Sequence, residues 1–281
     1  MRDHRVTIVI PTFNRANFLR QTIQSAVDQT EYCEIVVANH GSTDHTDDIV
    51  AEFGERVIYV RRETDFGPHY CWLDGVMHAT GEFVHLQYDD DWVKPTYIEK
   101  CMALMAPDVG CVFCETELFD NTTNQVTKTL FKGWLPGTGV FSTRRCERKM
   151  SRKLISPAAL IFRKAELIDA LYQGNLPLSK NHHHGVGPDC LVTLLALLRY
   201  PKQAFVAEPL AVFRSHNASI TVGAQSSRET ALKLKKAYRE VRRYYREQKF
   251  LKKWRAVVGL LPNPRDLTDR LPRSRELRKK K

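Results

Sequence analysis

A strand-then-helix alternation in the first 90 residues constrains the fold more than any other feature of the sequence. Short apolar runs such as Val6–Ile10 are followed by turn residues and then by segments with helical spacing, such as Asn17–Gln29. Repeated units of this kind predict a parallel sheet with right-handed crossovers, and therefore an α/β fold. The expected strands are 6–10, 34–38, 56–60 and 82–86, and the expected helices are 17–29, 44–53 (capped by Ser42 or Thr43) and 67–79.

Polar segments follow three of these expected strands at the points where the strands end. They are Pro11–Arg15, Asn39–Asp44 and Asp89–Asp91. In a parallel sheet the carboxyl ends of the strands lie at one edge, and ligands bind in the crevice outside that edge. We therefore expect the three segments to converge on one ligand site.

The most distinctive of the three segments is a run of consecutive aspartates, Asp89, Asp90 and Asp91, directly after an apolar strand. Adjacent carboxylates repel one another, and a hard cation such as Mg²⁺ or Mn²⁺ with oxygen ligands removes that repulsion. Because Mg²⁺ is usually held by one or two carboxylates plus substrate phosphates, the run predicts a metal–diphosphate site. The alternative is a solvated acidic turn whose carboxylates lie near Lys94 and a helix N-terminus.

The middle of the chain is less regular. We expect paired strands at 108–119 and 125–130, a further strand at 156–162 and a helix at 164–171. The loop Lys132–Gly139 is either a border of an acceptor site or a plain surface connection. The basic cluster Arg144–Lys153 is interpreted as a solvated face.

The segment 179–199 contains two sets of candidate functional residues. Three adjacent histidines, His182–His184, lie in a polar loop that we interpret as a mobile acceptor lid, because neighbouring side chains seldom all face one metal ion. Asp189 then opens an apolar helix. From the residues alone, Asp189 is either the N-cap of that helix or a catalytic carboxylate.

Composition and cysteine usage indicate a soluble globular protein, with 43% hydrophobic and 27% charged residues. The seven cysteines are scattered through apolar segments, and the charged start Met1–Arg5 is unlike a signal peptide. We therefore expect free thiols in a cytoplasmic protein. Cys111 and Cys114 resemble half of a zinc knuckle, but they fall in an expected strand and lack a second pair, so zinc is not expected.

The net charge of +11 resides in the last part of the chain, since 228–281 has 20 basic and 6 acidic residues. Apolar residues at helical spacing from Ala231 to Tyr245 predict a basic amphipathic helix. The apolar segment 254–261 is too short to span a membrane, and 262–281 is expected to be disordered. An anionic membrane surface or a polyanionic acceptor fits this charge, whereas no nucleic-acid-binding motif accompanies it.

Three motifs in order, VTIVIPTFNRANFLRQTIQSAVDQT, EIVVANHGSTDHT and ATGEFVHLQYDDDW, resemble the amino-terminal half of family 2 glycosyltransferases of the GT-A fold. The resemblance covers about residues 5–105. It implies a catalytic base at Asp189 and a divalent cation, Mn²⁺ or Mg²⁺, on Asp89 with Asp91 and His216 as further ligands. It also implies a nucleotide-sugar site formed by Pro11, Thr12, Asn14, Arg15, Asn39, His40, Gly67, Gln87 and Asp89.

The sequence departs from this family's pattern at two places. Gln87 stands two positions before the Asp89–Asp90 pair, where the family usually has an acid. Asn39–His40 stands where the family usually has two acids, the second of which commonly accepts a base N–H. A neutral imidazole nitrogen can accept one such hydrogen bond, so the identity of the donor's base is open.

The resemblance therefore implies a metal-dependent, inverting transferase that moves a sugar from a nucleotide-sugar to a saccharide, lipid-linked or other hydroxyl acceptor. We expect a transferase domain at 1–222 and a basic extension at 223–281, in a protein peripheral on the inner face of the membrane. Assembly of surface polysaccharide or glycoconjugate is the expected setting. The alternatives are a degenerate nucleotide-sugar-binding scaffold and a nucleotidyltransferase.

Overall fold

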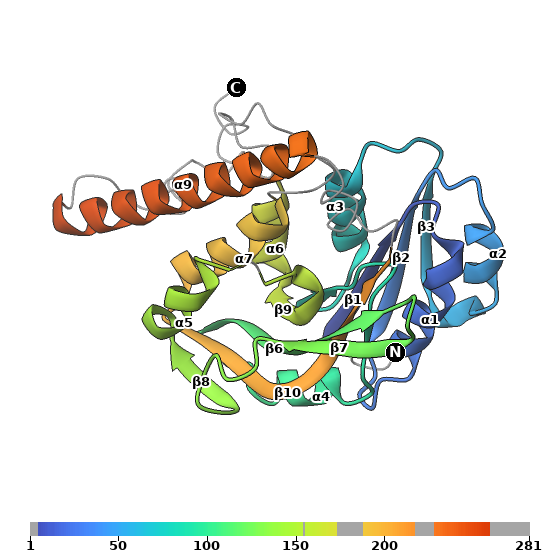
Figure 1. The fold of residues 1–281 in the computed structure, drawn as a ribbon, viewed down its shortest axis with the longest axis horizontal. Coiled ribbons are helices and arrows are strands. Elements are labelled where there is room, and N and C mark those ends of the chain that lie inside the picture. The colour runs from blue at the N-terminus through green and yellow to red at the C-terminus, as the bar shows by residue number, and fades with distance from the viewer. Residues whose placement is uncertain (1–4, 154, 173–187, 217–227, 259–281) are drawn as a thin grey trace, which may run out of the picture. The chain divides into compact units, whose positions relative to one another are not determined.

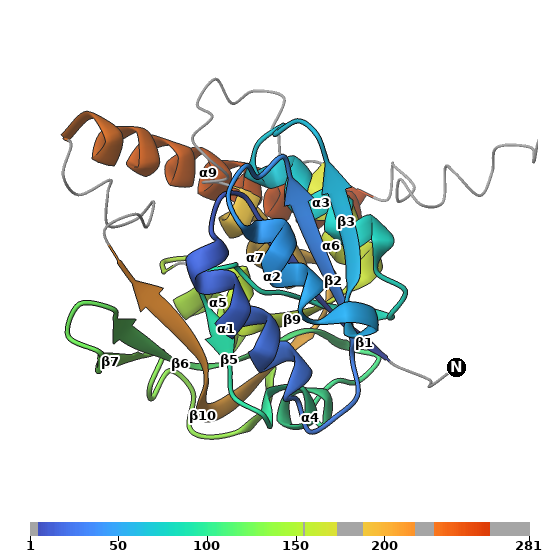
Figure 2. The same ribbon diagram turned by 90° about the vertical axis from the view of Figure 1, so that its right-hand side faces the viewer.

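One mixed sheet organises the computed structural model, which describes residues 5–153, 155–172, 188–216 and 228–258. The strand order is β3-β2-β1-β4-β9-β6-β10-β5, with β7 paired to β6 and β8 to β10 (Figure 1). Helices cover both faces of the first half of this sheet, since α1 and α2 lie on one side and α3 on the other (Figure 2). The predicted α/β class is confirmed.

The first half of the sheet has the predicted parallel strands. Residue Ile8 of β1 is in register with Ile35 of β2 on one side and His85 of β4 on the other. All seven residues of β1 are buried, as expected for a strand covered on both faces. The bounds are β1 (Val6–Thr12), α1 (Ala16–Val27), β2 (Glu34–His40), α2 (Thr46–Ala51), η1 (Gly54–Arg56), β3 (Ile58–Arg62), α3 (Pro68–His78) and β4 (Phe83–Leu86).

The second half of the sheet is mixed. The long strands β6 and β10 are parallel to each other, and β9 is antiparallel to both β4 and β6. The predicted pairing of 108–119 with 125–130 is confirmed by the antiparallel strands β6 and β7. The bounds are β5 (Trp92–Val93), β6 (Val109–Asp120), β7 (Gln125–Leu130), β8 (Gly139–Ser142), β9 (Leu160–Arg163) and β10 (Lys202–Ser215).

Among the described residues, five further α-helices accompany these strands. Two of them contain features described in the sequence analysis. Helix α7 begins one residue before Asp189, and α9 contains the basic amphipathic segment. The bounds are α4 (Tyr97–Met102), α5 (Thr143–Met150), α6 (Lys164–Tyr172), α7 (Pro188–Arg199) and α9 (Arg228–Val258).

One local prediction is confirmed only in part and another was wrong. The strand predicted at 156–162 is confirmed from Leu160 on, as β9, but the segment begins with a 3₁₀ turn, η2 (Pro157–Ala159), because the Ser156 hydroxyl accepts a hydrogen bond from the Ala158 amide and proline favours a first helical position. Neither Ser42 nor Thr43 caps α2; instead the Asp44 carboxylate accepts a hydrogen bond from the Thr46 amide at 3.1 Å.

All seven cysteines are free and buried. Burial raises the pKa of their thiols, for example to about 12 at Cys33 and about 11 at Cys146. Cys111 and Cys114 are both buried because the sheet around them is covered on both faces. Among the described residues, no three or more His, Cys, Asp or Glu side chains are gathered so as to hold a metal ion by themselves, and the absence of zinc stays a prediction.

The chain divides into two compact units, Met1–Arg242 and Arg243–Lys281. The predicted domain boundary at 222/223 falls in 217–227, outside the described residues, and stays a prediction. The same holds for the disorder predicted at 262–281. Within the described ranges, no helix is long and apolar enough to cross a membrane.

Candidate active site

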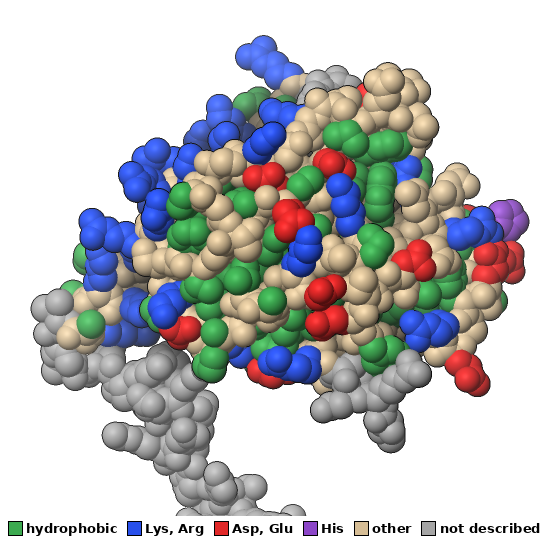
Figure 3. Space-filling model, turned by 90° about the horizontal axis from the view of Figure 1, so that it is seen from below, with side chains coloured by type: hydrophobic (Ala, Val, Ile, Leu, Met, Phe, Trp, Pro, Cys, Tyr) green, Lys and Arg blue, Asp and Glu red, His purple; other side chains and the backbone are tan. Residues whose placement is uncertain are grey.

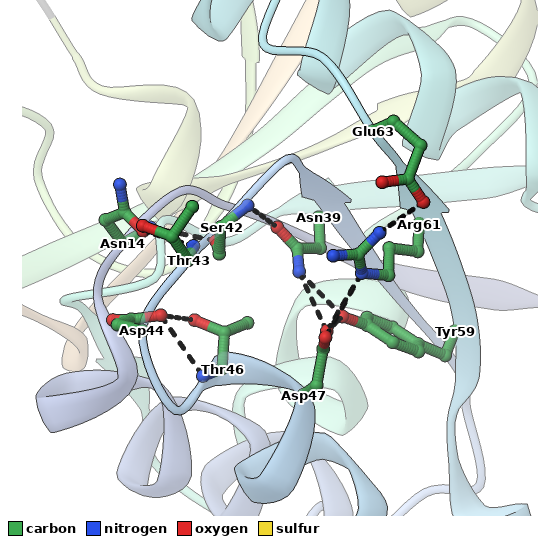
Figure 4. A network of polar contacts seen from close by, with 10 residues as sticks. All are labelled: Asn14, Asn39, Ser42, Thr43, Asp44, Thr46, Asp47, Tyr59, Arg61 and Glu63. Atoms are coloured by element: carbon green, nitrogen blue, oxygen red, sulfur yellow. Dashed lines mark hydrogen bonds and ion pairs between the residues drawn. The ribbon is translucent and has the colours of Figure 1, made fainter.

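The loops that follow β1 and β2 are bonded to each other, as the sequence predicted for these strand ends (Figure 4). The backbone amide of Asn14 donates to the Ser42 hydroxyl at 2.9 Å, and the Asn14 side-chain oxygen accepts from the backbone amide of Thr43 at 2.8 Å. Asn14 has a positive φ of 52°, a conformation that asparagine tolerates better than most residues. The two loops therefore form a single polar rim at the carboxyl edge of the sheet.

Asn39 lies beneath this rim and is completely buried (Figure 4). Its side-chain nitrogen donates to the Tyr59 hydroxyl at 2.7 Å and to Asp47 at 3.2 Å, and its oxygen accepts from the Ser42 amide at 3.0 Å. The Tyr59 hydroxyl also donates to Asp47, and together with Arg61 this lowers the pKa of that carboxyl. Asn39 shapes the loop through these bonds, and its contact with a nucleotide stays a prediction.

His40 is also buried, and its ring contacts a carboxylate that sequence analysis did not single out. Its Nε2 atom lies 3.3 Å from Asp74, whose two oxygens accept hydrogen bonds from Arg62 at 2.7 and 2.8 Å. The Arg62 guanidinium holds the pKa of Asp74 below its usual range, so Asp74 is an anion that favours a proton on Nε2. His40 Nδ1 has no hydrogen-bond partner among the described residues.

The aspartate run lies at the end of β4, and each of its carboxylates has a different environment. Asp89 is largely buried, with its carboxylate 3.9 Å from Arg15 Nε. Burial and the neighbouring Asp90 raise the pKa of Asp89 to about 7, although Arg15, the Thr12 hydroxyl and the Phe13 amide favour the charged form. A cation bound next to Asp89 would favour the charged form of its carboxyl.

Asp90 is the anion of the run. Its Oδ2 atom lies 2.9 Å from His216 Nε2 and forms an ion pair with Arg15. Burial opposes ionisation, but the His216 hydrogen bond and the Arg15 charge hold the pKa of Asp90 below its usual value. His216, predicted as a metal ligand, thus contacts the middle aspartate of the run.

Asp91 connects the run to β10 by a hydrogen bond. Its carboxylate accepts the Arg214 amide at 2.9 Å, and its carbonyl accepts the Thr22 hydroxyl at 2.8 Å. Burial and the neighbouring Asp90 raise its pKa well above the usual value. The Arg214 guanidinium lies over the ring of Trp92 at 4.7 Å. These contacts connect Asp91 to the scaffold, and its role as a metal ligand stays a prediction.

The remaining predicted donor-site residues are distributed around this cluster. Gln87 is completely buried and donates to the Thr22 carbonyl at 3.0 Å and the Ser25 hydroxyl at 3.1 Å, so its side chain contacts α1. Pro11 lies within β1. Gly67 precedes α3 with φ of 91°, a left-handed conformation that glycine adopts without strain.

Asp189 is the second residue of α7. One carboxylate oxygen accepts the Cys190 amide at 2.7 Å, and the other accepts the Tyr238 hydroxyl of α9 at 3.1 Å. Tyr88, next to Asp89, is half-buried and stacks on the Trp72 ring with the ring centroids 5.4 Å apart, and its pKa is raised by burial and then by the Asp189 charge. The predicted lid at 179–187, with His182–His184, lies outside the described residues.

Sequence reasoning missed Asp74, Arg214 and Tyr238 as partners of the predicted site residues. Arg214 stands two positions before His216, and that proximity was an available signal. Tyr238 was noted only as part of an apolar stripe, although a tyrosine in such a stripe carries a hydroxyl that needs a partner when buried. Nothing in the sequence around Asp74 indicates its contact with His40.

Comparisons with known proteins agree with this geometry. The sequence profile of Glycosyl transferase family 2 matches residues 7–167. The chain is similar to glycosyltransferase GlyA of Streptococcus pneumoniae, with 35% identity over 101 residues, which are 34% of this chain and 14% of that protein. It is 32% identical over 126 residues to an uncharacterized glycosyltransferase of Rickettsia typhi, covering 43% of this chain and 39% of that protein. The aligned part therefore spans less than half of either relative.

Two solved structures share the fold. S. aureus TarS residues 1–349 in complex with UDP-GlcNAc has a TM-score of 0.61 at 20% identity, covering 76% of this chain and 60% of that one. The mannosyltransferase PcManGT from Pyrobaculum calidifontis, in complex with GDP-Man and Mn²⁺, has a TM-score of 0.51 at 17% identity, covering 94% and 78%. At these identities the likeness extends to the GT-A-like fold alone.

Proposed function

The chain belongs to glycosyl transferase family 2, and from this membership we propose that it transfers a sugar from a nucleotide-sugar donor to an acceptor hydroxyl. The observation that carries the proposal is the meeting of Arg15, from the β1 loop, with Asp89 and Asp90 at the end of β4. All three lie within the matched residues. Because the family is an inverting one, a single displacement at the anomeric carbon is the expected reaction.

The donor set of the strand-end cluster fits a hard divalent cation. Asp89 and Asp90 offer carboxylate oxygens and His216 an imidazole nitrogen, which suit Mg²⁺ or Mn²⁺. Since the described residues contain no complete metal-binding group, the diphosphate oxygens of the donor would complete the shell. When bound, the cation neutralises the diphosphate as the leaving group.

The protein's own groups supply the remaining steps. Arg15 places a positive charge beside Asp89 and Asp90, where it can pair with a phosphate once a cation engages the carboxylates. Asp189 takes the proton from the acceptor hydroxyl as that oxygen attacks. The Tyr238 hydroxyl and the Cys190 amide each hold one oxygen of the Asp189 carboxylate and so fix its orientation.

A noncatalytic nucleotide-sugar-binding protein is the second candidate. It is favoured by the side chains at the two positions where the sequence departs from the family. Gln87 is engaged with α1, and Asn39 is engaged with Asp47 and Tyr59. A scaffold of this kind would bind the donor without turning it over, so turnover separates the two candidates.

For the setting of the reaction, the proposal draws on the basic segment 228–281. We place the reaction at the cytoplasmic side of an anionic membrane, with a saccharide, a lipid-linked saccharide or another hydroxyl compound as acceptor. The charge of this segment supports that placement. Assembly of a surface polysaccharide or glycoconjugate is the corresponding process.

A thermal-shift screen of UDP-, GDP-, CMP- and dTDP-sugars, with and without Mn²⁺, tests the proposal. A donor at about 100 times its Kd stabilises the native state enough to raise Tm by roughly 5 °C. The donor that does so is then assayed for Mn²⁺-dependent hydrolysis and transfer, with Asp89→Ala as the negative control. Binding without turnover would favour the scaffold, and no Mn²⁺-dependent binding by any donor would overturn the proposal.

A further inference from the structure

Two basic segments that are distant in the sequence are in direct contact in the first unit. Arg242 of α9 donates from Nε to the Ser151 carbonyl at 3.1 Å and from Nη2 to the Arg152 carbonyl at 3.4 Å. These carbonyls immediately follow α5, where backbone acceptors lack helical partners and a cation is favourable. The contact therefore joins the C-terminal end of α5 to the first half of α9, although nothing in the sequence pairs them.

The segment 143–153 is strongly basic, with six basic residues and one acidic residue, Glu147. All six basic side chains are exposed, and within the part of the chain that the structure describes none has an ion pair. This differs from the sheet half of the unit, where Arg20, Arg62 and Arg163 have carboxylate partners. The six are Arg144, Arg145, Arg148, Lys149, Arg152 and Lys153.

The first half of α9 contributes charge of the same sign. Its exposed basic residues Lys235, Lys236 and Arg239 lie within two turns of the Arg242 contact with α5. In Figure 3, acidic and basic side chains are interspersed over the middle of the face shown, and Lys and Arg gather toward one side. Like charges are unfavourable unless an anionic partner is present. We call the exposed basic residues of 143–153 and 235–239 the two-helix basic surface.

Exposed apolar side chains indicate which anionic partner fits. Leu232, one turn before this charge on α9, has 53% of its surface exposed. In the second unit, taken by itself, Phe250 and Trp254 of α9 are exposed beside Lys252 and Lys253. Basic residues alone fit any polyanion, but large apolar side chains among them fit a lipid surface, into which they can insert.

We infer that α5 and the first half of α9 together form the surface that docks on anionic lipid headgroups. This inference rests on the membrane partner in the proposed function and adds the site: the docking surface includes α5 (Thr143–Met150), a helix far ahead of the basic segment 228–281 in the sequence. Lysine and arginine near an anionic leaflet attract it within a Debye length, so binding through this surface falls with added salt.

The test is co-sedimentation of the full chain with vesicles of phosphatidylcholine alone or mixed with phosphatidylglycerol. Arg144→Gln, Arg148→Gln and Lys149→Gln are combined in one variant. The matched control combines Arg56→Gln, Lys128→Gln and Lys132→Gln, which remove three exposed basic residues elsewhere. The α5 variant is expected to bind phosphatidylglycerol vesicles at least about tenfold more weakly, and the control within about twofold of wild type.

Three outcomes would overturn the inference: equal losses in the α5 variant and the control, full binding by the α5 variant, or binding of soluble polyphosphate without binding of vesicles. Turnover with a soluble acceptor is measured in parallel and is expected to be unchanged in the α5 variant. Vesicle binding with no turnover by wild type would remove the proposed transferase activity and leave the docking surface standing. Circular dichroism confirms that each variant is folded.

Discussion

The aspartate run and Asp189 are both carboxylate sites, but they are stabilised in different ways. At the run, the Arg15 guanidinium and the His216 Nε2 atom contact Asp90, and the pKa of Asp89 is raised to about 7. At Asp189, two of the hydrogen-bond donors are the Cys190 amide and the Tyr238 hydroxyl, which are both neutral. A carboxylate paired with an arginine can exchange that partner for a metal, whereas these neutral donors orient the Asp189 carboxylate. We therefore assign the two sites to different steps of the proposed reaction.

Replacing the carboxylate of Asp189 gives the largest expected effect. Asp189→Asn keeps the shape and the helix-start hydrogen bond but removes the proton acceptor, so kcat and kcat/KM are expected to fall together by roughly 10²–10⁴-fold. Donor binding and Tm stay near those of wild type. Steady-state kinetics with a saturating donor measure the effect, and turnover within a few-fold of wild type would leave Asp189 as a helix cap.

Asp89→Ala is expected to act on binding. Without this carboxylate the cation and diphosphate lose a principal ligand, and donor affinity in Mn²⁺ is expected to fall by about 100-fold or more, in line with loss of a charged group from a buried site. His216→Ala is expected to weaken binding less, since the imidazole would bind the cation as a neutral ligand. Calorimetric titration measures both, and unchanged affinity in Asp89→Ala would assign the run to a structural turn.

The raised pKa of Asp89 predicts a pH dependence of metal binding. A carboxyl with a pKa of about 7 is protonated below that pH, and a cation must displace the proton. The apparent Mn²⁺ affinity is therefore expected to rise about tenfold per pH unit up to about pH 7 and then level off. In the metal-free protein the sign is opposite: the folded pKa exceeds the unfolded one, so stability from this group is lost as pH rises from about 4 to about 7.

Mn²⁺ titrations from pH 5.5 to 8.5 measure that slope. The variant Asp47→Asn is the matched control, because Asp47 lies outside the aspartate run and has a lowered pKa. The control is expected to keep the wild-type slope. A metal affinity that does not change below pH 7 would show that Asp89 is already ionised before the cation binds.

Tyr238→Phe gives the smallest expected effect and tests whether α9 orients Asp189. Loss of one hydrogen bond to a carboxylate is expected to lower kcat by roughly three- to tenfold, with donor KM unchanged. The acidic limb of the pH–rate profile is expected to move to higher pH, because the lost bond favoured the charged form. Tyr245→Phe removes the hydroxyl of another α9 tyrosine, one whose side chain is buried, and is expected to leave the profile in place. If both variants shift the limb equally, Tyr238 has only a structural role.

The sequence predicted those elements whose formation depends on residues close to one another in the chain. Val6–Ile10 and the helices after it follow from apolar spacing, because burial on two faces and on one face give different periods. The convergence of the β1 and β2 loops follows from parallel topology. The 3₁₀ turn at Pro157–Ala159 was missed because an apolar run does not reveal how Ser156 bonds to the backbone.

The parts that were not predicted depend on contacts between distant residues. His216 meets Asp90 across 126 positions, Tyr238 meets Asp189 across 49, and Arg242 meets Ser151 across 91. His216, Tyr238 and Arg242 all lie in segments that the sequence marks as distinctive, but the partner of each is set by the packing of β10 or α9 on the rest of the first unit. Periodicity gives no information on such pairings, and the site was therefore predicted as a set of candidates without its internal bonds.

Because every cysteine is buried, the reactivity of the thiols can report local opening of the fold. A thiol with a raised pKa and no solvent exposure reacts with an alkylating reagent only after its surroundings open, so its labelling rate reports how often they do. Cys33 precedes β2 in the first half of the sheet, whereas Cys190 directly follows Asp189 on α7. The order in which these thiols are labelled would therefore distinguish local opening around β2 from local opening beside the proposed base, without a substitution in the sequence.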